Sequence, residues 1–295
     1  MNEKRNRKSK KTNQMKEIWR RFRKSKTAML GLCLLIFVLC IAIFADVITP
    51  YENAISQSAN RLDGPSAAHI FGTDELGRDL FARIVHGSRY SLLIGVSTSV
   101  LALVIGGLLG AIAAYYGGWV DNIIMRLTDV VMTVPPILLS LAVVAALGGS
   151  LRNLLIAITI SCVPSMLRLV RSVVLGVVDE DYIEAARSYG ASDMRIILKY
   201  VIPNALGPII VTTTMNVANM ILSAAGLSFL SLGVQPPAPE WGALLSDAKT
   251  YMFTAPHLLY IPGIFIVIAA LSFNLAGDGL RDALDQITMI LSAIV

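Results

Sequence analysis

The segment Tyr182–Asn204 reads YIEAARSYGASDMRIILKYVIPN, and it separates two long apolar stretches of the chain. Its first half is rich in good helix formers, which favours a short helix. Gly190 then readily takes the positive φ that ends a helix. Ser192 is a suitable N-cap, and a helix seldom continues past the residue before a proline. The pattern predicts a helix, a hinge at Gly190, and a second helix that ends before Pro203.

This insert is longer than a plain connector between two apolar segments needs to be. The adjacent residues Ala185 and Ala186 leave room for another surface to approach closely. Glu184, Arg187 and Arg195 supply charges that can fix the register of such a contact. A connector lying on the membrane surface is the alternative interpretation. The length and the central glycine favour a segment that contacts a partner.

The whole chain has the composition of an integral membrane protein. Of its 295 residues, 55% are hydrophobic and only 15% are charged. A bilayer core of about 30 Å needs ~20 apolar helical residues for each crossing, and runs of this kind recur along the sequence. The predicted spans are Thr27–Ala45, Tyr90–Val120, Val130–Leu151, Asn153–Val178, Tyr200–Pro239 and Thr250–Gly277. The predicted fold is therefore an all-α integral membrane protein with six transmembrane helices.

The spacing of these spans predicts an asymmetric organisation, with one isolated helix followed by a compact five-helix unit. The predicted segments are a basic tail over 1–26, the first transmembrane helix over 27–49, an extracytoplasmic loop over 50–89, the five-helix domain over 90–285 with its polar insert at 180–202, and a C-terminal tail over 286–295.

The distribution of positive charge predicts the orientation. Twelve of the 25 Lys and Arg residues lie in the first 26 positions, and cytoplasmic flanks of membrane proteins hold the excess of positive charge. Six spans then return the C-terminus to the cytoplasm, and segments 117–129 and 179–203 face the same side. Beside a hydrophobic span, topology and contact with the lipid bilayer explain the basic tail better than nucleic-acid binding. We expect no nucleic-acid partner.

The sequence lacks the constellations typical of a membrane enzyme or a metal site. His69, His86 and His257 are far apart, no HExxH motif occurs, and the three cysteines all lie in predicted spans. No GxxxxGK[ST] phosphate loop occurs either, so we expect no ATP site in this chain. A secondary transporter usually has internal repeats or intramembrane charge pairs, and neither is evident. We expect no catalytic residue, metal or cofactor.

Charged residues in the outer segment form a first group with two possible roles. The group comprises Asp74, Arg78, Asp79 and Arg83. Opposite charges at helical neighbour spacing are typical of a self-paired, solvated surface loop. The alternative is a docking or gating surface for an extracytoplasmic protein. We favour the self-paired surface loop.

Arg168 and Arg171 form a second group, because they fall within the fourth predicted span. Charged side chains are costly in the middle of a bilayer. Their long side chains can extend to the inner interface, or they can face a transport pathway as a gate. The nearby cytoplasmic segment slightly favours the interface.

The insert shows a specific resemblance. It contains Glu184-Ala185-Ala186, then Gly190 after three intervening residues, then Tyr200-Val201-Ile202-Pro203 after nine more, and this pattern resembles the EAA signature of membrane subunits of bacterial ABC importers. Tyr200 and Ile202 replace the commonest Ile and Leu. Further segments resemble the C-type permease of dipeptide and oligopeptide importers, namely Phe71–Asp79, Gly226–Leu230, Gln235–Pro237, Trp241–Gly242 and Gly277–Asp282. The likeness extends from about Arg20 to Asp285.

The resemblance implies a type I ABC importer permease, with a MetI-like five-helix core and an N-terminal accessory helix. It implies a multi-pass protein of the bacterial cell (inner) membrane that pairs with a B-type permease, two cytoplasmic ATPases and an extracytoplasmic substrate-binding protein. ATP and Mg²⁺ would then be bound by the partner ATPases. The residues implied in coupling are Glu184, Ala185, Ala186, Arg187, Gly190, Asp193, Arg195 and Pro203. Dipeptides or oligopeptides are the expected substrates, while nickel or other metal chelates, glutathione and haem remain alternatives.

Overall fold

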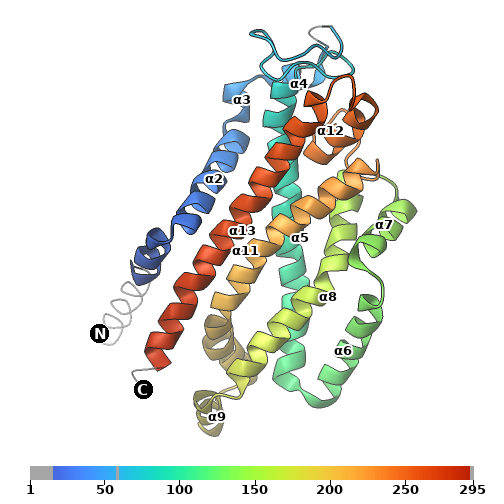
Figure 1. Ribbon diagram of the computed structural model, residues 1–295. Coiled ribbons are helices and arrows are strands. Elements are labelled where there is room, and N and C mark those ends of the chain that lie inside the picture. The colour runs from blue at the N-terminus through green and yellow to red at the C-terminus, as the bar shows by residue number, and fades with distance from the viewer. Residues whose placement is uncertain (1–15, 58–59, 293–295) are drawn as a thin grey trace.

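The computed structural model describes residues 16–57 and 60–292, and this part of the chain contains helices and no strand. Positions 1–15 of the predicted basic tail and 293–295 of the predicted C-terminal tail lie outside the described residues. A helix over 16–24 is followed by the elements labelled in Figure 1. These are α2 (Lys26–Ile43), α3 (Ala45–Ile48), α4 (Tyr51–Ile55), α5 (Leu80–Tyr116), α6 (Gly118–Met132), α7 (Pro136–Leu147), α8 (Leu151–Val178), α9 (Asp181–Ser188), α10 (Asp193–Ile196), the π-helical turn η1 (Ile197–Val201), α11 (Ile202–Phe229), α12 (Trp241–Ala248), the 3₁₀ turn η2 (Lys249–Tyr251) and α13 (His257–Ser292).

Five helical segments are long and apolar enough to cross a membrane. They are α2, α5, α8, the continuous helix Asp193–Phe229 and α13. The third predicted span is instead the broken pair α6 and α7, whose axes differ by 80°. The break follows from the dipeptide Pro135-Pro136, because two prolines in succession cannot donate the hydrogen bonds that a continuous helix requires. Counting this pair as one span gives the six that the sequence predicts.

Helix α5 begins ten residues earlier than the predicted second span. Asp79 caps its N-terminus, since the carboxylate accepts hydrogen bonds from the backbone N–H groups of Phe81 at 2.8 Å and Ala82 at 3.4 Å. The last part of the predicted extracytoplasmic loop is therefore helical. At the other end of the chain, α13 continues without a break to Ser292, through most of the predicted C-terminal tail.

The centre of the bundle is the close contact between α5 and α8. A Cβ atom added at Gly106 would lie 2.8 Å from the carbonyl oxygen of Val163, and one at Gly110 would collide with the carbonyl oxygen of Leu167. Glycines at four-residue spacing let two helix backbones approach in this way. The GxxxG face of the second span thus packs within the same chain.

The accessory helix α2 packs along α13 (Figure 1). Gly31 allows the approach, because a Cβ there would lie 2.5 Å from the Cβ of Leu275. A small apolar cluster of Phe22, Ala28 and Ala283 closes the lower end of this contact. The first helix is therefore joined to the five-helix unit through its last helix.

Candidate functional site: the α9–α10 elbow

The polar insert forms an elbow at one end of the bundle, where α9 projects beyond the ends of α8 and α11 (Figure 1). Helix α9 ends before Gly190, whose φ is 73°, as the predicted hinge requires. The backbone N–H of Ala191 donates to the carbonyl oxygen of Ala186 at 3.1 Å, which closes the end of α9. The predicted first helix and hinge are confirmed.

The predicted end of the second helix before Pro203 is wrong. Helix α10 passes through the π-helical turn η1 directly into α11, so one continuous helix spans Asp193–Phe229. In a regular α-helix the proline ring clashes with the carbonyl group four residues earlier. Pro203 is the second residue of α11, and the wider turn that precedes it accommodates the ring. The elbow is therefore rigidly continuous with a membrane-spanning helix.

Two isoleucines anchor the elbow to the bundle. Ile183 of α9 and Ile196 of α10 are both fully buried. They belong to an apolar cluster that includes Ala114 of α5 and Met166 and Val170 of α8. Burying an Ile side chain contributes about 1.5–3 kcal/mol. Each arm of the elbow is thus attached to the ends of α5 and α8.

Tyr115 connects α5 to both arms of the elbow. Its hydroxyl group donates a hydrogen bond of 2.6 Å to the Asp193 carboxylate of α10. The guanidinium carbon of Arg187, in α9, lies 5.2 Å from the centre of the Tyr115 ring. Sequence reasoning included Arg187 and Asp193 but missed Tyr115, because a tyrosine near the end of a span is also typical of a membrane-interface residue.

The outward side of the elbow is exposed and partly apolar. Tyr189 at the hinge is 92% exposed, and Met194 and Leu198 are 65% and 59% exposed. Glu184 and Ala185 are exposed beside them, as are Arg187 and Arg195, whereas Ala186 is half-buried. We call the exposed set Glu184, Ala185, Arg187, Tyr189, Met194 and Leu198 the elbow surface. Exposed apolar side chains next to charges are typical of a protein-binding surface.

Arg168 and Arg171 both pair with carboxylates of α6. Arg171 binds Asp121 through two hydrogen bonds of 2.5 and 2.6 Å, and Arg168 donates to Asp129 at 2.5 Å. Bidentate arginine–carboxylate contacts, such as that of Arg171, fix the relative orientation of the two side chains as well as pairing their charges. These pairs attach α6 to α8.

The charged group of the outer segment is self-paired as predicted, but the prediction of a solvated surface loop is wrong. Asp74, Arg78 and Arg83 are 2%, 4% and 1% exposed. Asp74 accepts hydrogen bonds from Arg78 at 2.6 Å and Arg83 at 2.5 Å, and Arg83 also lies 3.6 Å from Asp247 of α12. Burial raises the pKa of Asp247. Asp79, the fourth member, caps α5.

A groove lined by both polar and apolar residues lies between α7, α8 and α11, and sequence reasoning did not identify it; we call it the polar groove because of its serines and asparagines. Its volume is about 190 Å³, and its polar lining residues are Ser140, Ser161, Ser165, Asn216, Asn219 and Ser223. The Ser140 hydroxyl group donates to that of Ser161 at 2.8 Å, which connects α7 to α8. Serines and asparagines scattered through apolar helices carry no pattern that sequence alone distinguishes from helix-packing contacts.

Comparisons with known proteins agree with this geometry. The family model described as "Binding-protein-dependent transport system inner membrane component" matches residues 106–288, and that of the "N-terminal TM domain of oligopeptide transport permease C" matches residues 13–65. The dipeptide transport system permease protein DppC of Alkalihalophilus pseudofirmus is 47% identical over 270 residues, which cover 92% of this chain and 89% of the relative. The glutathione transport system permease protein GsiD of Escherichia coli O6:K15:H31 is 48% identical over 271 residues, covering 91% and 89%.

Among solved structures, a chain of the inward-facing MetNI methionine ABC transporter matches with a TM-score of 0.59 and 20% identity. The match covers 69% of this chain and 97% of that one, and it supports the MetI-like fold. The chain belongs to the family of binding-protein-dependent transport system inner membrane components and is a permease subunit of an ABC importer.

Proposed function

We propose that this chain forms half of the translocation pathway of an importer for dipeptides or oligopeptides, and that partner ATPases drive it through the elbow surface, which thereby acts as a coupling surface. The observation that carries the proposal is the construction of the elbow. Its outward side is exposed, while Ile183 and Ile196 are fully buried against α5 and α8. A displacement of the elbow would therefore move three membrane-spanning helices together.

The proposed partners follow from what the chain contains and lacks. The chain has a single coupling surface, which fits one ATPase subunit. The sequence of the chain has no phosphate loop that would bind ATP. Two ATPases would then require a second, B-type permease with its own elbow, and an extracytoplasmic binding protein would deliver substrate. This subunit would hydrolyse nothing itself. Alternating access would arise as ATP-dependent closure of the ATPase pair moves the elbow.

The proposed orientation places the elbow and both termini in the cytoplasm, in a bacterial inner membrane. The support is the excess of Lys and Arg in the first 26 residues. The proposed domain division remains an accessory helix, an outer segment and a five-helix permease unit. In this orientation the buried group around Asp74 stabilises the extracytoplasmic end, rather than presenting its charges to the binding protein.

The proposed substrate class follows from the polar groove and the relatives. The side-chain amides of Asn216 and Asn219 in the groove can both donate and accept hydrogen bonds, which suits the peptide bonds of a short chain. One relative is described as a dipeptide permease and the other as a glutathione permease. Glutathione is itself a tripeptide. Short peptides are therefore the substrate class that we propose.

The test is reconstitution. The tagged chain is purified in mild detergent with its partners, placed in proteoliposomes with the binding protein, and assayed for ATP-dependent uptake of a labelled dipeptide, glutathione, nickel chelate and haem. We expect a second permease and two P-loop ATPases to copurify, and peptide uptake to require ATP. Uptake by this chain alone without ATP, or uptake of nickel chelate or haem in preference to peptides, would contradict the proposal.

Gly190→Val tests the hinge of the elbow in this reconstituted system. Valine is strained at a φ of 73°, although nothing lies within 4 Å of the position that its Cβ would occupy. We expect normal insertion and copurification, with ATP hydrolysis that no longer drives uptake. Gly176→Val, at a helical glycine with equally open surroundings, is the control.

A further inference from the structure

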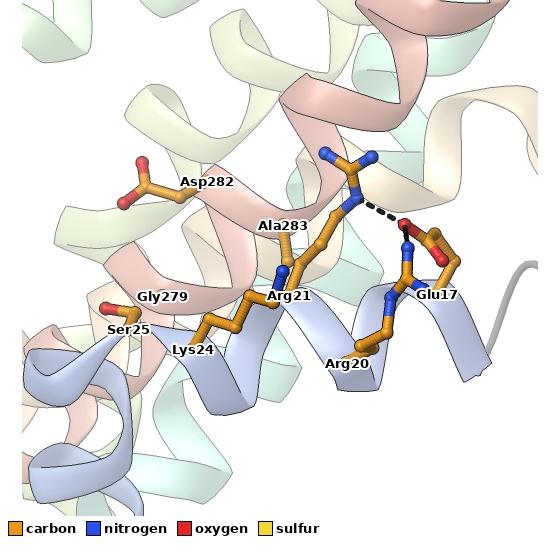
Figure 2. Close-up of a pocket in the computed structure, with 8 residues that line it drawn as sticks. All are labelled: Glu17, Arg20, Arg21, Lys24, Ser25, Gly279, Asp282 and Ala283. Atoms are coloured by element: carbon orange, nitrogen blue, oxygen red, sulfur yellow. Dashed lines mark hydrogen bonds and ion pairs between the residues drawn. The ribbon is translucent and has the colours of Figure 1, made fainter.

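A pocket opens between the start of α2, the C-terminal third of α13 and the helix over 16–24. Its volume is about 410 Å³, and it is lined by Glu17, Arg20, Arg21, Lys24, Ser25, Gly279, Asp282 and Ala283 (Figure 2). The apolar span of α2 starts directly after Lys26, and the uncharged run of α13 ends at Gly277, before Asp278, Arg281 and Asp282. Because both spans end here, the pocket lies at the boundary between the bilayer core and water.

Three of the lining side chains are cationic. Glu17 neutralises part of this charge, since its carboxylate pairs with Arg20 at 2.8 Å and with Arg21 at 2.9 Å. The ammonium group of Lys24 forms no ion pair or hydrogen bond with the described residues, and it extends toward the pocket in Figure 2. Asp282 lies on the opposite wall. Negative charge is therefore favoured on the side of Arg20 and Lys24.

The helix over 16–24 has the amphipathic character of a segment that lies in the membrane interface. Phe22 is buried against Ala28 and Ala283, and it stacks on Trp19 with ring centres 6.0 Å apart. Trp19 itself is 52% exposed. A basic helix with an exposed tryptophan is typical of the headgroup region. The pocket is thus part of a surface that faces lipid headgroups.

The start of α2 adds to the positive potential. Ser25 caps this 18-residue helix by accepting a hydrogen bond from the N–H of Ala28 at 3.3 Å. The N-terminus of a helix carries partial positive charge. The packing here is tight, because a Cβ added at Gly279 would collide with Ala28. The walls of the pocket are therefore built by helices that are firmly packed together.

We propose that this pocket binds the phosphate group of an anionic glycerophospholipid, with Arg20 and Lys24 as its cationic ligands. Basic pockets between helices at a membrane surface are suited to phospholipid headgroups. The bound lipid would hold the accessory helix α2 against α13. The proposal does not depend on which solute the permease transports.

The test measures phospholipid binding to the purified full-length chain by native mass spectrometry, with phosphatidylglycerol and phosphatidylethanolamine as probes. Each cation near an anionic membrane surface strengthens binding by about fivefold, so Arg20→Gln with Lys24→Gln should raise the Kd for phosphatidylglycerol about thirtyfold. Asp282→Asn should bind at least as tightly as the unaltered protein. Arg126→Gln removes an exposed cation of α6, on the far side of the bundle, and should change nothing.

Thermal unfolding of each variant in lipid-free detergent checks that the fold is intact. Unchanged phosphatidylglycerol binding in the double variant would overturn the proposal, as would equal affinity for phosphatidylethanolamine. Displacement of the lipid by millimolar glycerol 3-phosphate would also overturn it, because the site would then serve a free phosphate. Selective loss of phosphatidylglycerol binding in the double variant alone would support it.

Discussion

The hydroxyl group of Tyr115 is expected to hold the elbow closed against α5, and Tyr115→Phe isolates its contribution. The substitution removes the 2.6 Å hydrogen bond to Asp193 and leaves the aromatic ring under Arg187. Hydrogen bonds to charged groups contribute about 1.5–3 kcal/mol, and the exposure of Asp193 favours the lower part of that range. Local opening of the elbow should become about 10- to 30-fold more frequent, since about 1.5–2 kcal/mol corresponds to that factor.

Hydrogen exchange measured on peptides covering 181–196 tests this expectation in the assembled transporter. Exchange of these amides should accelerate by that factor in Tyr115→Phe, and the number of ATP molecules hydrolysed for each peptide imported should rise. Tyr116→Phe is the matched control, because Tyr116 is adjacent, 58% exposed and in edge-to-face contact with Tyr115. Exchange at the unaltered rate in Tyr115→Phe would refute the idea that this hydroxyl group restrains the elbow.

Three further substitutions probe other contacts. Gly110→Val should separate α5 from α8, because its side chain would collide with Leu167, and thermal unfolding in detergent should occur well below the temperature of the unaltered protein. Asp74→Asn removes the closest carboxylate of the buried Arg83 and leaves the ion pair with Asp247 at 3.6 Å, so we expect a loss of about 3–5 kcal/mol, measured by denaturant unfolding. In Glu240→Gln, an NH₂ group replaces one of the two buried carboxylate oxygens that cap α12. We expect a loss of about 1–3 kcal/mol in the free energy of unfolding, measured in the same assay. An unchanged midpoint would show that the cap is dispensable.

Local signals in the sequence were sufficient to predict the elbow. A helix-forming run followed by a glycine describes α9 and its hinge completely, because a turn depends on residues close together in the chain. Pro203 was misread for a related reason. A proline normally ends a helix, and only the π-helical geometry of η1 explains why this helix continues.

The buried charges show where reasoning from local sequence fails. Spacing alone indicated that Asp74, Arg78 and Arg83 pair with one another, and the structure has these pairs. Their burial also depends on α12, whose Asp247 lies within 3.6 Å of Arg83 but far from it in sequence. Periodicity carries no information on such long-range contacts. The same limit explains why Tyr115 and the polar groove were missed.

The two arginines of the fourth span illustrate a different limit. Arg168 and Arg171 were predicted to be costly in lipid, and the structure pairs them with Asp129 and Asp121. Both acids lie in α6, which sequence reasoning divided between a loop and a span. The bend of 80° after α6 determines where these acids lie, and only the three-dimensional arrangement reveals it.

The central claim is that the exposed side of the elbow contacts a partner ATPase, and site-specific photo-crosslinking in cells tests it most directly. A photoreactive amino acid is placed at Tyr189, which is 92% exposed, and a second variant carries it at Phe253, which is 90% exposed and lies between α12 and α13, at the end of the bundle opposite to α9. The account predicts that Tyr189 captures a P-loop ATPase and that Phe253 does not. Capture of the ATPase at Phe253, or of no ATPase at Tyr189 in cells that import peptide normally, would contradict it.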